Sequence, residues 1–129
     1  MKKTFLVILG TGLILFCVFV IYTFSTIHRQ VEEITMIAVN EYKLDAIESL
    51  TRLVKSENHS FKDKNSAIWA LGQFADQRAL PFLEELYSQT AENSPCSRNN
   101  ELCKYEIEKA IKWCMNGNWT SWMYKKIDK

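Results

Sequence analysis

The sequence has few of the residues that interrupt helices or impose loops. Its 129 residues include only 4 glycines and 2 prolines, which excludes a collagen-like or loop-dominated chain. It also has no excess of one charge, because 16 Lys and Arg face 15 Asp and Glu, a formal net charge of +1. This balance argues against a basic nucleic-acid-binding protein. Hydrophobic residues are abundant at 47%, too many for a disordered chain.

Sequence signals of catalysis are also scarce. His28 and His59 are the only histidines, and there is no C-x-x-C motif or glycine-rich phosphate loop. The adjacent acids at 84–85 and the pair Glu106 and Glu108 point to different sides of a helix, so we interpret them as solvated faces. We therefore expect no catalytic residue, no metal site and no bound cofactor.

A long uncharged run predicts a membrane-spanning helix. No charged residue occurs from Phe5 to Ile27, and a helix of these 23 residues is about 34 Å long. The hydrocarbon core of a bilayer is about 30 Å thick, so the run can cross it. We interpret residues 1–27 as an uncleaved signal anchor and residues 28–129 as a separate domain.

Two other interpretations of this run are open. Lys2 and Lys3 could also begin a cleaved signal peptide, although the run is long for one and no A-x-A cleavage site follows it. A lipoprotein signal ending at Cys17 would need a small residue where Phe16 stands.

The flanking charges predict the orientation. Two lysines and no acid precede the run, whereas the other flank carries one arginine and two glutamates. The positive-inside rule then places the N-terminus in the cytoplasm and residues 28–129 outside, on the periplasmic side if the membrane is a bacterial inner membrane. Removing Lys2 and Lys3 from the 16 basic residues leaves 14 against 15 acids, so we expect no basic patch there. We interpret the final lysines as a solvated chain end: Lys125, Lys126 and Lys129.

The remaining chain is predicted to be helical. Ile27, Val31, Ile34 and Ala38 recur at helical spacing, so the first helix continues beyond the apolar run. Further helical patterns separated by turn-like residues cover residues 46–54, 67–74, 80–87 and 102–114. We find no alternating stretch long enough to form a strand.

Several residues indicate where these helices begin and end. Asp45 and Asp76 are expected to cap the second and fourth helices, and Pro81 lies in the first turn of the fourth. Gly117 suits the end of the fifth helix, and Asn118 could cap a last short helix.

The stretch KNSAIWALGQFADQRALPFLEEL at 64–86 resembles a HEAT repeat of the short type found in bilin-lyase-like proteins. The resemblance implies an all-α fold, a short solenoid of antiparallel helix hairpins. It also implies that two small residues let the hairpin's helices approach closely, that an aspartate caps the second helix, and that an arginine pairs with an acid of a neighbouring repeat. The matching positions are Ala70, Gly72, Asp76, Arg78 and Pro81.

The resemblance covers one repeat well. Residues 46–57 look like the second helix of a preceding repeat, and residues 100–116 like the first helix of a following one. An array usually needs about three repeats for stability, so we expect a disulfide, the aromatic C-terminus or a partner to supply the remainder.

Three cysteines follow the apolar run. Cys103 and Cys114 are 11 residues apart on one predicted helix, about 16 Å, which is too far for a bond. Cys96 is then the common partner, and we favour its pairing with Cys103 over Cys114. Three free buried thiols are the alternative.

The resemblance implies a non-enzymatic protein-binding module, with the second helix of each repeat forming a concave ridge. An alternative from the same family is an accessory subunit of a small-ligand, lyase-like enzyme that uses a cysteine thiol. The two C-terminal tryptophans either form a cap packed over the last helix or are exposed anchors for a partner or the bilayer interface. The candidate partner-binding residues are Glu48, Arg52, Glu84, Glu85, Trp119 and Trp122.

Overall fold

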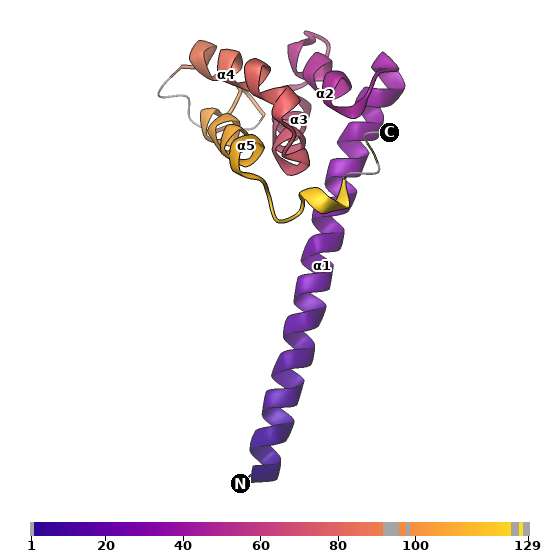
Figure 1. The fold of residues 1–129 in the computed structure, drawn as a ribbon, viewed down its shortest axis with the longest axis vertical. Coiled ribbons are helices and arrows are strands. Elements are labelled where there is room, and N and C mark those ends of the chain that lie inside the picture. Colours follow the sequence, from indigo (N-terminus) through magenta and orange to yellow (C-terminus); the bar gives the residue numbers. More distant parts are fainter. Residues whose placement is uncertain (1, 92–95, 98, 125–126, 128–129) are drawn as a thin grey trace. The chain divides into compact units, whose positions relative to one another are not determined.

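The computed structural model describes residues 2–91, 96–97, 99–124 and 127, and it confirms the all-α fold class (Figure 1). No strand occurs within these ranges. The chain divides into two compact units, Met1–Gln30 and Val31–Lys129. The helices are α1 (Lys2–Tyr42), α2 (Ala46–Lys55), α3 (Phe61–Phe74), α4 (Leu80–Gln89) and α5 (Lys104–Asn116), with 3-10 turns η1 (Gln77–Ala79) and η2 (Ser121–Met123).

The first unit is a single helix with exposed apolar side chains. Its exposed large hydrophobic side chains between Val7 and Tyr22 each keep 57–70% of their surface accessible. The hydroxyls of Thr11, Thr23 and Thr26 donate to the carbonyl four residues earlier, at 2.9 Å, so these polar groups are satisfied within the helix. By length and composition this helix can cross a membrane, a test that signal sequences also pass.

The second unit begins with the end of α1, residues 31–42, which is followed by α2. Val31, Ile34 and Ala38 are buried there, which confirms the predicted apolar face. Asp45 caps α2 as predicted, because its carboxylate accepts from the backbone N–H groups of Ile47 at 3.1 Å and Glu48 at 3.2 Å.

The next pair is α3 and α4, joined by η1. The prediction that Asp76 caps α4 is wrong in detail: Asp76 caps η1 by accepting from the Arg78 N–H at 2.8 Å, and α4 starts after Ala79 with no side-chain cap. The extra 3-10 turn moves the cap four residues ahead of α4. Pro81 lies within the first two residues of α4, where a missing N–H breaks no helical bond.

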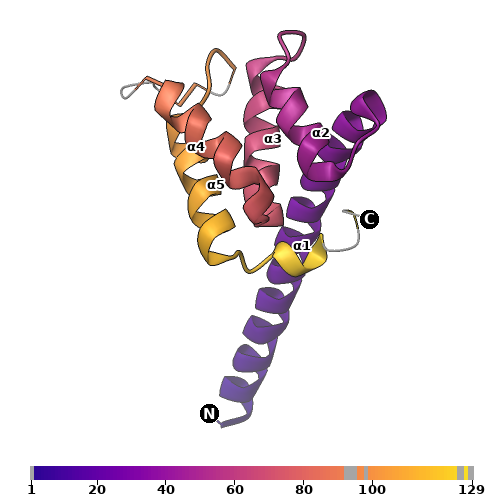
Figure 2. The same ribbon diagram turned by 45° about the horizontal axis from the view of Figure 1, so that its top comes forward.

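Helix α5 packs against both α3 and α4, and α3 also packs against α2 (Figures 1 and 2). Gly72 lies where α3 approaches α5 closely. An added Cβ would lie 2.9 Å from the Ala110 Cα and 2.9 Å from the Trp113 Cε3. The small residue was expected to serve the approach of α4 within the same hairpin; instead it serves α5, the helix of the following one.

The chain end after α5 is only partly as predicted. Gly117 ends α5 with φ 85°, a conformation that suits glycine. The last helix is a single 3-10 turn that contains Trp122 but not Trp119, and its N-cap position is Thr120 rather than Asn118.

One core joins all these elements in the second unit. Its largest fully buried side chains come from the end of α1, from α2, α3, α4 and α5 and from the segments before and after α5. They include Leu50, Leu53, Ile68, Leu71, Leu83, Ile107 and Tyr124.

Candidate interaction surface

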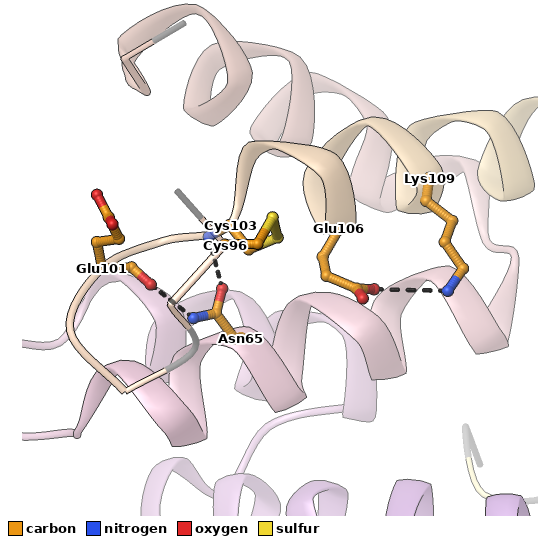
Figure 3. Close-up of a disulfide and its surroundings, with 6 residues drawn as sticks. All are labelled: Asn65, Cys96, Glu101, Cys103, Glu106 and Lys109. Carbon is orange, nitrogen blue, oxygen red and sulfur yellow. Dashed lines mark hydrogen bonds and ion pairs between the residues drawn. A yellow bond between two sulfur atoms is a disulfide. The ribbon is translucent and has the colours of Figure 1, made fainter. Parts of the chain in front are cut away.

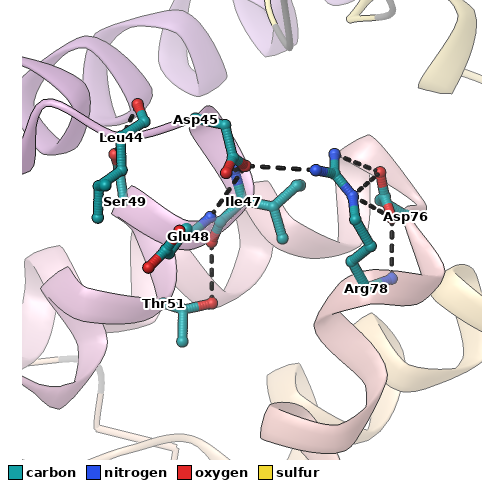
Figure 4. A network of polar contacts seen from close by, with 8 residues as sticks. All are labelled: Leu44, Asp45, Ile47, Glu48, Ser49, Thr51, Asp76 and Arg78. Carbon is teal, nitrogen blue, oxygen red and sulfur yellow. Dashed lines mark hydrogen bonds and ion pairs between the residues drawn. The ribbon is translucent and has the colours of Figure 1, made fainter.

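A polar network connects the start of α2 with η1, the 3-10 turn between α3 and α4 (Figure 4). The Arg78 guanidinium binds Asp76 through two nitrogens, with Nη2 2.8 Å from Oδ2, and its Nη1 lies 3.5 Å from Oδ1 of Asp45. This hydrogen bonding lowers the pKa of the Asp76 carboxyl below its usual value. One arginine therefore bridges the carboxylate that caps α2 and the carboxylate that caps η1, which is the kind of inter-repeat pairing expected for this position.

The outer face of α2 carries two of the candidate partner-binding residues. Glu48 and Arg52 are exposed and form an i, i+4 ion pair at 3.2 Å. Both line an open polar groove of about 600 Å³, which also has Glu41, Tyr42 and Lys55 along its walls.

The other acidic candidates lie on α4. Glu84 and Glu85 are exposed, and neither lines the α2 groove. A side chain of α2 nevertheless reaches α4, because the Lys55 ammonium lies 5.2 Å from the centre of the Phe82 ring. We call the outer faces of α2 and α4 around this contact the α2–α4 face, defined by Glu48, Arg52, Lys55, Phe82 and Glu85. Glu84, one position earlier on α4, points to another side of the helix and is left out of this face.

The two C-terminal tryptophans are both exposed, Trp119 over 92% of its surface and Trp122 over 66%. The expectation that they form a packed cap is therefore wrong. Tyr124 has that role: it is fully buried, and its ring centre lies 5.3 Å from that of Phe74.

The segment carrying Trp119 is fixed to α3 by the side chain of Gln73, which is 4% exposed. The Asn118 Nδ2 donates to the Gln73 Oε1 at 3.0 Å, and the Thr120 hydroxyl donates to the same oxygen. The residues on both sides of Trp119 are thus held by one buried amide, while Trp119 itself faces solvent.

The structure joins Cys96 to Cys103 by a disulfide, the pairing that the sequence favoured (Figure 3). Asn65, in the first half of α3, holds the same segment. Its Oδ1 accepts from the Cys103 N–H at 2.9 Å, and its Nδ2 donates to the Glu101 carbonyl at 2.7 Å. Because Cys103 is the N-cap of α5 and provides no side-chain cap bond, the disulfide and Asn65 fix this helix start instead.

The free cysteines among the described residues are Cys17 and Cys114. Cys114 is 2% exposed, and its thiol donates to the Leu71 carbonyl at 3.6 Å. Burial, with a smaller effect of the Asp76 charge, raises its pKa to about 11. The thiol is therefore protonated at neutral pH and is a poor nucleophile.

Sequence reasoning missed Asn65, Gln73 and Tyr124. Asn65 and Gln73 bond to residues 36 to 47 positions away, and no short-range pattern encodes such a contact. Within the described ranges, no group of three or more His, Cys, Asp or Glu residues could hold a metal ion.

Comparison with known proteins identifies one repeat in the second unit. Residues 64–89 match the family model of the PBS lyase HEAT-like repeat, which spans most of α3, η1 and all of α4. No curated protein and no solved structure matches the chain. The second unit thus contains a HEAT-like repeat, preceded by the end of α1 with α2 and followed by α5.

Proposed function

We propose that the protein is a membrane-anchored, non-catalytic scaffold whose HEAT-like unit binds a protein partner through the α2–α4 face. The observation that carries the proposal is the bridge from Arg78 to Asp45 and Asp76, since it links the start of α2 to the turn that precedes α4. Stacked helix pairs generally bind proteins through surfaces of this kind. The face offers charges of both signs and the half-buried Phe82 ring beside them.

The topology proposed from the sequence has the N-terminus in the cytoplasm and the second unit on the far side of the membrane, the periplasm in a bacterium. The Cys96–Cys103 disulfide supports this assignment, because such bonds persist in oxidising compartments. The apolar helix supplies the anchor, and its orientation follows from the lysines that precede it.

The state of the cysteines supports a non-catalytic role over an accessory enzyme with a reactive thiol. Two of the three cysteines after the apolar run are joined in the disulfide. The third, Cys114, has a pKa raised to about 11 and is buried. Neither state provides a thiolate at neutral pH.

The test is site-specific photocrosslinking of the full-length chain in its membrane. A photoreactive residue at Ser88, exposed on α4, captures the partner. Arg52→Glu and Glu85→Arg should each reduce capture about tenfold or more, because a reversed charge in an interface costs several kcal/mol. Lys112→Glu, an exposed change on α5, is the matched control and should capture normally.

Two results would contradict the proposal. Capture of the same partner at the wild-type level by both charge-reversed variants would exclude the α2–α4 face. Protease treatment of intact spheroplasts that leaves residues 28–129 uncut, while cleaving them after lysis, would reverse the proposed topology.

A further inference from the structure

The segment from Met115 to Tyr124 combines features that the proposed protein-binding face does not use. Trp119 and Trp122 are the most exposed of the large hydrophobic side chains described in the second unit. The sequence of this segment, MNGNWTSWMY, has no charged residue; Lys125, Lys126, Asp128 and Lys129 come after it and lie outside the described residues. Exposed apolar surface that a fold keeps in place often marks a site of interaction.

Hydrogen bonds around the two tryptophans keep the backbone of this segment in place. Gln73 holds Asn118 and Thr120, and the Ser121 hydroxyl donates to the Asn118 carbonyl at 2.8 Å. Beyond Trp122, Tyr124 is fully buried against Phe74. The backbone on both sides of the two tryptophans is therefore fixed, so less conformational entropy is lost when the rings bind.

The chain connectivity indicates what Trp119 and Trp122 bind. The core of the second unit starts at Val31, and the uncharged run ends at Ile27. Four residues span at most about 14 Å, even when fully extended. A domain of about 100 residues has a radius of gyration of about 13 Å, so every part of its surface stays within about 50 Å of the bilayer to which it is tethered.

We infer that Trp119 and Trp122 insert into the headgroup region of the bilayer that anchors the chain, so that the segment from Met115 to Tyr124 is a second, peripheral membrane contact. Indole rings concentrate at this depth because they combine an apolar body with an N–H donor. The inference rests on the membrane anchoring in the proposed function and not on the α2–α4 face.

The test uses the full-length chain in vesicles of phosphatidylcholine and phosphatidylglycerol, with bromine atoms on the lipid acyl chains near the headgroup. Bromine quenches tryptophan at short range. The residues before Val31 contain no tryptophan, so any quenching reports on the second unit. We expect strong quenching of the wild type and loss of most of it in Trp119→Phe/Trp122→Phe. The half-buried Trp69 provides the matched control, and Trp69→Phe should keep the quenching.

Three outcomes overturn the inference. Equal quenching of the wild type and the double variant would mean that these rings lie outside the bilayer. Emission that aqueous acrylamide quenches and bromolipid does not would leave the rings in water, or available to a protein partner. A chain that fails to float with the vesicles would overturn the anchor itself, whereas a chain that floats without bromolipid quenching refutes only the second contact.

Discussion

At the residue scale, burial sets the chemistry of Cys114 more than any neighbouring charge does. The thiol is enclosed among α3 and α5, where it donates to the Leu71 carbonyl and also contacts the Asp76 backbone. The sequence predicted a small buried residue here, because Cys114 shares the apolar face of its helix. The pKa of about 11 follows from that burial, since a low-dielectric site disfavours the thiolate.

We predict that the second unit loses stability as the pH rises from about 9 to 11. The folded state keeps Cys114 protonated up to its pKa of about 11, whereas the unfolded chain releases the proton near the ordinary value of 9.0. The unfolded state then binds fewer protons, so the free energy of unfolding falls by at most about 1.4 kcal/mol per pH unit. Urea titrations of the full-length chain in detergent, followed by circular dichroism, measure this slope.

The matched variant is Cys114→Ala, which keeps a small apolar side chain at the site. Between pH 9 and 10 its free energy of unfolding should vary less with pH than that of the wild type. Above pH 10 both proteins should weaken, because burial also raises the pKa of Tyr124 to about 12. An unchanged slope in the alanine variant between pH 9 and 10 would assign the effect to another group.

At the element scale, local signals predicted the helices and did not predict which helices touch. Asp45 was identifiable as a cap because it bonds to N–H groups two and three residues away. Gly72 was identifiable as a small contact residue, but the expected neighbour α4 was wrong, because no local pattern distinguishes α4 from α5. The 3-10 turn η1 was missed for a similar reason, since 3-10 and α-helical turns share the same local pattern.

We predict that Gly72→Ala destabilises the second unit by about 1–2 kcal/mol. Alanine improves helix propensity by about 1 kcal/mol, so the variant would be stabilising at an unobstructed site. Here the new methyl group meets the Ala110 backbone, which cannot move without shifting α5, and such overpacking costs about 1–3 kcal/mol or more. Chemical denaturation of the full-length chain in detergent gives the difference in unfolding free energy.

Two variants identify the cause of that loss. Gly72→Ala/Ala110→Gly should recover only part of the stability, because it removes the Ala110 Cβ at 3.1 Å but leaves the Cα at 2.9 Å. Gly12→Ala, in α1 with no atom within 4 Å of the added Cβ, should leave the second unit unchanged. A stabilised Gly72→Ala variant would contradict the close approach of α3 and α5.

At the scale of the whole molecule, the second unit is short for a repeat array. One repeat matches the family model, and the helices on either side are incomplete neighbours. The predicted supplements were a disulfide and the aromatic C-terminus, and the structure contains both, with Tyr124 rather than the tryptophans in the core. Choosing among these aromatic residues required the positions of Phe74 and Gln73, which lie 45 to 50 residues earlier in the chain.

Because so small a unit has little stability in reserve, we predict that reducing the Cys96–Cys103 bond lowers its free energy of unfolding by about 2–3 kcal/mol. The loss should affect the whole unit, since the bond fixes the start of α5 and α5 packs against α3 and α4. The melting temperature of the full-length chain should fall by about 10–20 °C. Thermal scans with and without a phosphine reductant measure it.

Cys96→Ser is the matched variant, because Cys96 is exposed and Cys103 still fills its buried position. This variant should melt like the reduced wild type and should not respond to the reductant, whereas Cys114→Ala should respond like the wild type. A wild type that melts at the same temperature after complete reduction would show that Asn65 and the core hold α5 without the bond. If the predicted loss is found, the unit is stable only where the bond can form, which links its stability to an oxidising compartment.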